Sequence, residues 1–216
     1  MIDIMFNVNL TIYMEAIDMR YPPEETAAKH RRILEEAGRL FRERGFAGVS
    51  VSEIMKATGL THGPFYNHFA SKEALMAEAL ADLSSRTHAD FDRIVAEEGI
   101  AAYLDLYLSR RHVDSPGAGC LMTALAADTA KEPATRGAFT AHVKGAIERL
   151  MRAMPGKRRA ESGARAGTQA GAQADTRAEA MRALAATVGA VMLARAVDDP
   201  ALGDEILAAT RHGLAD

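Results

Sequence analysis

The chain has 216 residues, of which 48% are hydrophobic, 25% charged and 6% aromatic, with a formal net charge of −3 at pH 7. This length allows one large or two small domains, and the composition excludes collagen-like, disulfide-rich and fully disordered proteins. Abundant Ala and Met with few aromatic residues favour helices over strands. Taken alone, the acidic total argues against a nucleic-acid-binding protein.

Cys120 is the only cysteine, which excludes an internal disulfide and fits a reducing cytoplasmic environment. No apolar run approaches the roughly 18 residues that a membrane helix needs, so no membrane association is expected. Residues 1–19 are apolar but lack the basic start and cleavage site of a signal peptide. We interpret them as an N-terminal extension that is either disordered or the product of a wrongly assigned start, because Met14 and Met19 are alternative start sites.

The pattern becomes helical from Glu24 to Arg44, where apolar residues form one stripe and charged residues cover the remaining surface. Gly45 is expected to end this helix as its C′ residue. A short second helix is predicted after Ser50, because Ser50 and Glu53 form a capping-box pattern.

Beyond the turn at Gly59, a third short helix is predicted over about residues 61–69, with Pro64 in its first turn. Two short helices joined by a glycine-containing turn are typical of the helix-turn-helix, whose second helix lies in the DNA major groove. That helix must be apolar on one side and hydrogen-bonding on the other. Its predicted outward residues are Thr61, which is also the expected N-cap, His62, Gly63, Tyr66, Asn67 and His68.

Ser71 is expected to cap a longer fourth helix that runs to about residue 95. Weaker helical patterns follow at about 100–111, 120–131 and 134–153, with a loop at 115–119. Residues 155–176 contain no large apolar side chain and are predicted to be a flexible insert. Helicity returns over 178–197, and after the break at Asp199–Pro200 a last helix is expected over about 201–212. No strand alternation is found, so the sequence predicts an all-α fold.

The run VSEIMKATGLTHGPFYNHFASKEAL (51–75) resembles the DNA-binding head of TetR/AcrR-type transcriptional regulators. The resemblance covers about residues 24–80, and a weaker one covers the run GAVMLARAVDDPALGDEIL (189–207). It implies an all-α homodimer with an N-terminal three-helix helix-turn-helix domain at 20–70. A C-terminal helical ligand-binding and dimerisation domain would occupy 71–216, and the helices at 134–153 and 178–197 would form the dimer's four-helix bundle. The residues before Arg20 and the insert depart from the family pattern.

The resemblance also implies residue roles and a function. Phosphates would be contacted by Ser50, Tyr66 and Lys72, and bases would be faced by Thr61, His62 and Asn67, with His68 at the edge and Gly63 allowing close backbone approach. The implied protein is a repressor that binds palindromic double-stranded operator DNA as a dimer, with half-sites about 10 bp apart. A small-molecule inducer, which the sequence does not identify, would release it.

The charges are distributed unevenly along the chain, so the net charge of −3 does not exclude DNA binding. Residues 20–72 carry nine Lys/Arg against six acidic residues, a net charge of +3, whereas residues 1–19 and 73–216 each carry −3. The basic excess therefore coincides with the predicted DNA-binding segment. Binding through such a segment is expected to weaken steeply with salt.

The second half of the chain leaves several alternatives open. One set of residues at helical spacings either forms ordinary core or lines a mostly apolar ligand pocket: Tyr103, Tyr107, Met122, Leu125, Phe139 and Val143. The histidines at 88, 112 and 142 either line that pocket or hold surface and capping roles. Cys120 is either a small core residue or a reactive thiol that senses electrophiles or oxidants.

Catalytic signatures are missing from the sequence: there is no nucleophile elbow, phosphate-binding loop or dinucleotide-binding glycine pattern. No Cys/His/Asp cluster has the spacing of metal ligands. We therefore expect neither an enzyme nor a bound metal or cofactor. A DNA-binding regulator without an inducer is the second alternative to the ligand-responsive repressor, beside the thiol sensor.

Overall fold

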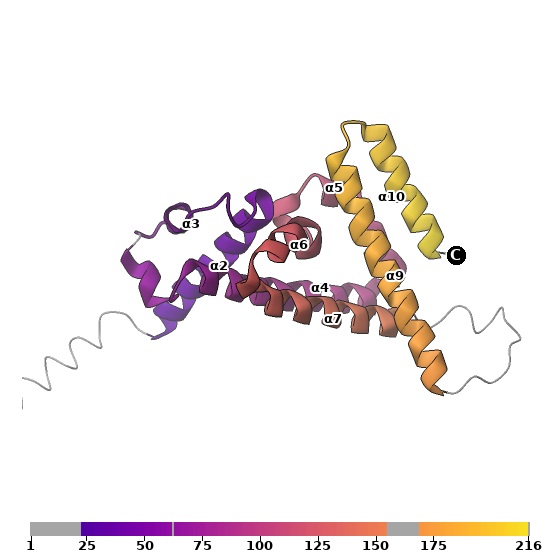
Figure 1. Ribbon diagram of the computed structural model, residues 1–216, viewed down its shortest axis with the longest axis horizontal. Coiled ribbons are helices and arrows are strands. Elements are labelled where there is room, and N and C mark those ends of the chain that lie inside the picture. The colour runs from indigo at the N-terminus through magenta and orange to yellow at the C-terminus, as the bar shows by residue number, and fades with distance from the viewer. Residues whose placement is uncertain (1–22, 62, 155–168, 216) are drawn as a thin grey trace, which may run out of the picture.

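The computed structural model describes residues 23–61, 63–154 and 169–215 (Figure 1). Its elements are α2 (Pro23–Arg44), α3 (Val51–Ala57), the 3₁₀ helix η1 (Gly63–Asn67), α4 (Lys72–Tyr107), α5 (Arg110–Val113), η2 (Pro116–Ala118), α6 (Leu121–Lys131), η3 (Pro133–Thr135), α7 (Arg136–Ala153), α9 (Gln169–Ala196) and α10 (Pro200–Ala215). No strand occurs within these ranges, which confirms the predicted all-α fold. The predicted extension 1–19 and His62 lie outside the described residues.

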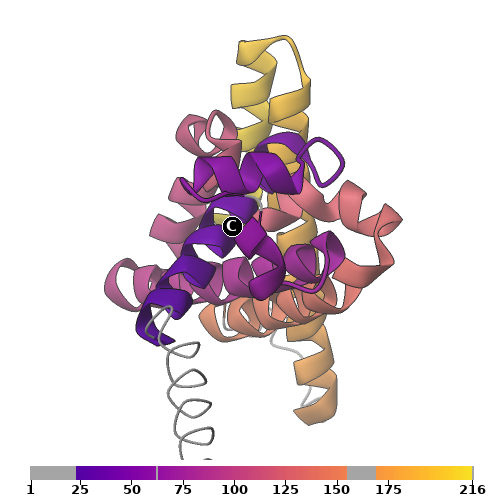
Figure 2. The same cartoon turned by 90° about the vertical axis from the view of Figure 1, so that its left-hand side faces the viewer.

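Helices α2 and α3 and the turn η1 form the head, which lies at the left of Figure 1 and faces the viewer in Figure 2. The predicted apolar stripe of α2 is buried, with Ile33 and Phe41 at most 1% exposed. Gly45 ends this helix with φ 73° and donates its N–H to the carbonyl of Phe41 at 2.8 Å, which confirms it as the C′ glycine. The capping box of Ser50 and Glu53 is also present as predicted.

The third head helix is shorter and tighter than predicted. Residues Gly63–Asn67 form a five-residue 3₁₀ helix, so the expectation of a helix over 61–69 is wrong in its length and type. The carbonyl of Phe65 accepts from the N–H groups of both His68 and Phe69, at 2.9 and 3.0 Å. Since Phe65 and Phe69 are both buried, this tight turn places two aromatic rings under the exposed surface.

The fourth helix is longer than predicted. It begins after the Ser71 N-cap, as expected, but continues to Tyr107 across a break at Gly99, where φ is 85° and ψ 170°. This backbone conformation is essentially restricted to glycine. The predicted helices near 95 and 100–111 are therefore one element with a kink, followed by the short helix α5.

Helix α9 begins inside the segment predicted to be a flexible insert. Residues 169–176 form the first two turns of α9 and are not a flexible connection, because this stretch is rich in Ala and Gln, which have high helix propensity. Residues 155–168 lie outside the described residues. The break at Asp199 is confirmed, since its Oδ1 accepts from the N–H groups of Ala201 and Leu202 at 2.9 and 3.2 Å and caps α10.

In the body, α4 packs along α7, α7 packs against α9, and α9 packs against α10 (Figure 1). One continuous apolar core joins head and body, running from Phe41 and Phe65 through Leu80 to Leu121 and Val191. The position of the head therefore depends on packing in the body. No described helix is long and apolar enough to cross a membrane.

Candidate functional site

The turn η1 presents polar residues to solvent above a buried aromatic base. Tyr66 is 66% exposed, and Thr61, Gly63 and Asn67 are also exposed, whereas Phe65 and Phe69 are buried. A Cβ added at Gly63 would meet no atom within 4 Å, so the backbone there is open to close approach. This division into outward and inward residues is the one that a major-groove helix requires.

His68 is placed differently from its polar neighbours. It is only half-buried, but its ring centroid lies 5.7 Å from that of His30 on α2. Burial, followed by the nearby charges of His30 and Lys29, lowers the pKa of His68. His30 in turn contacts Glu78 of α4, with Nε2 and Oε1 2.6 Å apart. His68 therefore belongs to the junction between η1, α2 and α4, at the edge of the exposed surface.

Ser50 is committed to a helix cap. Its Oγ accepts from the Glu53 N–H at 3.2 Å and donates to Glu53 Oε2 at 2.7 Å. The Ser50 backbone N–H, then its hydroxyl, then Arg44 lower the pKa of Glu53 to about 2. Ser50 is exposed and thus reachable by a phosphate, but its hydroxyl proton already has an acceptor.

Lys72 at the start of α4 is half-buried, and its Nζ donates to the carbonyl of Phe46 at 2.7 Å. This bond ties the N-terminus of α4 to the loop after α2. An ammonium group carries three N–H donors, so Lys72 retains two for a phosphate oxygen.

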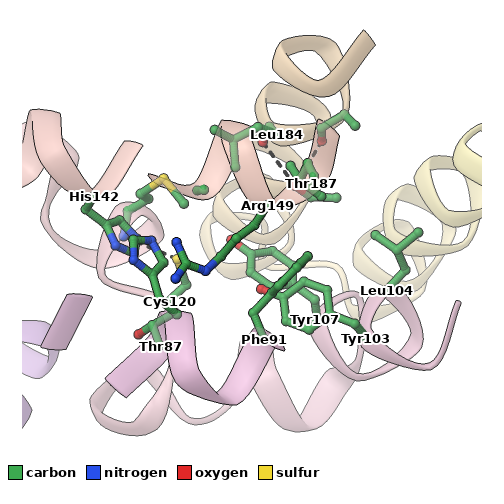
Figure 3. Close-up of a pocket in the computed structure, with 15 residues that line it drawn as sticks. Thr87, Phe91, Tyr103, Leu104, Tyr107, Cys120, His142, Arg149, Leu184 and Thr187 are labelled. Atoms are coloured by element: carbon green, nitrogen blue, oxygen red, sulfur yellow. Dashed lines mark hydrogen bonds between the residues drawn. The ribbon is translucent and has the colours of Figure 1, made fainter. Parts of the chain in front are cut away.

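A cavity of about 30 Å³, enough for one water molecule, lies between α4, α6, α7 and α9 (Figure 3). Its walls are formed by Thr87, His88, Phe91, Tyr103, Leu104, Tyr107, Cys120, Met122, His142, Ala146, Arg149, Leu150, Ala183, Leu184 and Thr187. Figure 3 shows His142 and Arg149 on one side, with Tyr103, Tyr107 and Leu104 on the other. Three of the predicted pocket residues, Tyr103, Tyr107 and Met122, are in this wall.

The other three predicted pocket residues do not line the cavity. Leu125 is 0% exposed in the main core, and Phe139 and Val143 pack against that core. Sequence spacing could not separate them from Tyr103, because core and pocket walls share the same helical period.

A larger cleft of about 550 Å³ lies outside the cavity, and Thr87, Tyr103, Tyr107 and Cys120 line both spaces. These four side chains are therefore the partition between them. The cleft wall also carries four arginines and one acidic residue: Arg42, Arg86, Arg93, Arg111 and Asp90.

Two histidines that the sequence left between pocket and surface roles are in the cavity wall. The rings of His88 and His142 stack with centroids 4.6 Å apart and an interplanar angle of 9°. His142 Nδ1 lies 2.9 Å from Ser84 Oγ. Burial, followed by the charges of His88 and Arg149, lowers the pKa of His142 to about 4. Burial is also the main cause of the lowered pKa of His88, so both imidazoles are neutral near pH 7.

The third histidine, His112, has a capping role. Its Nε2 accepts from the Cys120 N–H at 3.0 Å, so its Nδ1 donates to the Tyr107 carbonyl at 2.7 Å. Arg195 of α9 donates to the carbonyls of His112 and Val113 at 2.7 and 3.0 Å. These bonds hold the end of α5 against both α9 and the cavity wall.

Cys120 is 6% exposed and occupies the N-cap of α6, where its Sγ accepts from the Met122 N–H at 3.4 Å. It is thus both a buried core residue and a wall of the two spaces. Within the described residues, no three His, Cys, Asp or Glu side chains are grouped so as to hold a metal ion.

Residues 33–79 match the family model described as bacterial regulatory proteins, tetR family. An uncharacterised HTH-type transcriptional regulator, YdgC of Bacillus subtilis, is 40% identical over 70 residues, which are 32% of this chain and 36% of that protein. The HTH-type transcriptional repressor KstR2 of Rhodococcus jostii is 35% identical over 78 residues, 35% of this chain and 38% of that protein. The chain therefore matches less than half the length of these relatives.

Solved structures share the fold over most of the chain. The reduced form of NemR from E. coli superposes with a TM-score of 0.68 at 23% identity, covering 87% of this chain and 95% of that one. A TetR-family regulator from Agrobacterium tumefaciens gives 0.68 at 20% identity, covering 87% and 97%. Relatives of this kind are DNA-binding regulators and not enzymes, as the sequence predicted. The family match in the head, the relatives and the shared fold support a TetR/AcrR-type transcriptional regulator, as the sequence predicted.

Proposed function

We propose that the chain is a transcriptional repressor that acts in the cytoplasm, binds a palindromic operator as a homodimer and is released by a small molecule. The observation that carries the DNA-binding part is the exposed polar surface of η1 above buried Phe65 and Phe69, within the segment that matches the family model. The net charge of +3 over residues 20–72 supports it, since phosphate neutralisation contributes much of the affinity for DNA.

Gel-shift titration of the upstream region of its own or a neighbouring gene, at low salt, tests this proposal. We expect binding that Tyr66→Ala weakens at least tenfold. Leu106→Ala is the matched control, because Leu106 is also a large exposed side chain but lies in the body. No binding anywhere in that region, or equal affinity for the Tyr66 variant, would contradict the proposal.

The dimer part is supported by apolar side chains exposed on neighbouring helices, Met181, Met192 and Leu193 on α9 and Leu202 on α10. Helix α7, expected in the dimer bundle, buries its apolar residues Ile147 and Leu150 within the chain. We therefore assign the dimer face to α9 and α10.

Sedimentation velocity measures the oligomeric state directly. We expect a dimer for the unmodified chain and a monomer for Leu193→Glu, because a desolvated carboxylate in an apolar interface is costly. Leu106→Glu, an equally polar change on another exposed leucine, should leave the dimer intact. A monomeric unmodified chain would refute this assignment.

The release part is supported by the cavity and its thin partition from the outer cleft. A regulator without an inducer would instead show the same operator affinity across a panel of metabolites. One observation favours a thiol sensor, namely that Cys120 lines both the cavity and the cleft. Against it, the Cys120 side chain is buried and caps α6. If Cys120→Ser still responds to every inducer, the thiol is not the sensor.

A further inference from the structure

The cavity contains an unusual concentration of unsatisfied polar atoms. Four buried side-chain polar atoms lack a hydrogen-bond partner in the described part of the chain, and three belong to cavity residues: His88 Nε2, His142 Nε2 and Tyr107 Oη. Leaving such an atom unpaired costs free energy, because the atom has lost its hydrogen bonds to water without replacing them. Their grouping in one cavity indicates a place built for a polar group of an incoming molecule.

The protonation of His88 determines what that group must be. The backbone of His142 counteracts the lowering of the His88 pKa by burial, as expected when the imidazole donates to the His142 carbonyl. Because Nε2 has no partner in the described part of the chain, we assign the proton of neutral His88 to Nδ1. Neutral His88 therefore presents a lone pair at Nε2 and requires a donor.

His142 adapts to either role. Its Nδ1 partner is the hydroxyl of Ser84, which both donates and accepts, so its Nε2 can be a donor or an acceptor. Tyr107 keeps its hydroxyl proton, since burial raises its pKa well above the ordinary 10.0. A hydroxyl group on the ligand, which donates once and accepts twice, matches this set. A carboxylate has no proton for His88.

The remaining wall favours a neutral apolar body. The guanidinium of Arg149 is already paired with Asp92, with Nη2 and Nε 3.0 and 3.1 Å from Oδ2. A charged ligand would therefore lose its hydration without gaining an unpaired counter-charge. Aromatic rings line the other side, with Phe91 and Tyr103 in an edge contact at 4.6 Å. Such rings favour an aromatic ligand.

We propose that this cavity binds a neutral hydroxylated aromatic compound of the phenol class, whose hydroxyl donates to His88 Nε2 and whose ring packs against Phe91 and Tyr103. The inference rests on the proposed ligand-responsive function and names its ligand class. A space of about 30 Å³ does not hold a phenol, so the ligand must displace the partition of Thr87, Tyr103, Tyr107 and Cys120 and arrive from the outer cleft.

Equilibrium binding of three matched probes to the full chain tests the proposal at pH 7.5, without DNA. The probes are 4-methylphenol, toluene and 4-methylbenzoate, which share one ring and one methyl group. We expect 4-methylphenol to bind at least tenfold more tightly than either of the others. Equal or tighter binding of toluene or 4-methylbenzoate, or binding of none, would overturn the proposal.

Variants of the cavity residues then test which side chain accepts the hydrogen bond from the ligand hydroxyl. His88→Phe keeps a flat ring and removes the acceptor, so the tenfold preference for 4-methylphenol over toluene should vanish. Leu125→Met changes a buried residue that does not line the cavity and should keep the preference. Tyr107→Phe, which removes a hydroxyl and little volume, should reduce the preference severalfold and serves if His88→Phe does not fold. A folded variant at either position with the full preference contradicts the assignment.

Failure of this inference and failure of the proposed function are distinguishable. Selective phenol binding by a chain that never binds DNA would preserve the inference and refute the repressor. Operator binding and release by a compound lacking a hydroxyl would preserve the repressor and refute the inference.

Discussion

Arg42 of α2 donates from Nη1 to the carbonyl oxygen of Gly119 at 3.0 Å, which joins the head to the residue immediately before Cys120 in the cavity wall. Its Nε also donates to the Gly38 carbonyl at 3.2 Å, so the guanidinium bridges α2 and the η2 turn. Burial, followed by the charge of Arg86, lowers the pKa of Arg42. A displacement of the partition would therefore strain the hydrogen bond between Arg42 of α2 and Gly119.

Arg42→Ala is expected to lower the free energy of unfolding by about 1.5–3 kcal/mol, because it removes hydrogen bonds from a charged donor. It should also bring the ratio of operator affinities with and without 4-methylphenol toward one. Denaturant titration and gel shift measure these effects. Arg39→Ala is the control, since Arg39 lies on the same helix in exposed pairs with Glu36 and Glu43, which contribute about 0–1 kcal/mol. Equal losses for both variants would contradict the bridging role.

Gly99→Ala should destabilise the protein by about 1–3 kcal/mol through backbone strain alone. A Cβ at Gly99 meets no atom within 4 Å, but its φ of 85° is unfavourable for alanine. Gly137→Ala is a matched control, because that glycine has equally open surroundings and lies in the first turn of α7 without a positive φ. Thermal or urea unfolding should show a loss for Gly99→Ala and no loss for Gly137→Ala.

The free energy of unfolding should decrease as the pH falls through the range in which His142 gains its proton on unfolding. The pKa of His142 is about 4 in the folded chain and about 6.5 when unfolded, so unfolding takes up a proton between these values. The contribution is complete above pH 6.5, declines as the pH falls toward 4, and amounts to at most about 3 kcal/mol.

Urea unfolding at a series of pH values checks this window. His142→Asn should flatten the pH dependence, leaving the parts contributed by His68, His88 and His112, whose pKa values are also lowered. Leu106→Ala changes an exposed side chain that carries no ionisable group and should leave the slope as it is. An unchanged slope in the His142 variant would contradict the assignment of the window to this residue.

Mutations should distinguish the residues that contact bases from those that contact phosphates. Asn67→Ala is expected to cost about 1–3 kcal/mol for the preferred operator and to relax discrimination at one base pair. Tyr66→Phe and Lys72→Ala should weaken binding to all sequences alike, and Lys72→Ala should reduce the salt slope by about 1. Gel shifts on operator variants at several salt concentrations check both expectations. A uniform loss for Asn67→Ala would show that it contacts the backbone.

The head was predictable because its determinants are local. The apolar stripe of α2, the φ of Gly45 and the cap of Ser50 each depend on residues within a few positions along the chain. The wall of the cavity was only partly predictable. His88 and His142 meet across two helices and are separated by 54 positions, so no spacing along the sequence indicates their stacking.

Two differences in the body have equally physical reasons. The pattern near residue 95 weakens because α4 bends at Gly99, and a kinked helix shows no single apolar face. The start of α9 lacks large apolar residues, which suggested disorder, but helix propensity and its continuation into a packed helix keep it helical.

The partition between cavity and cleft should limit the rate at which a ligand binds. The cavity of about 30 Å³ is too small for an aromatic ring, so its walls must open before a ring can enter. If this opening precedes binding, the observed association rate will rise with ligand concentration only until it reaches the opening rate. At high ligand concentration, the rate of binding would then be limited by the movement of the four partition side chains and not by the ligand concentration.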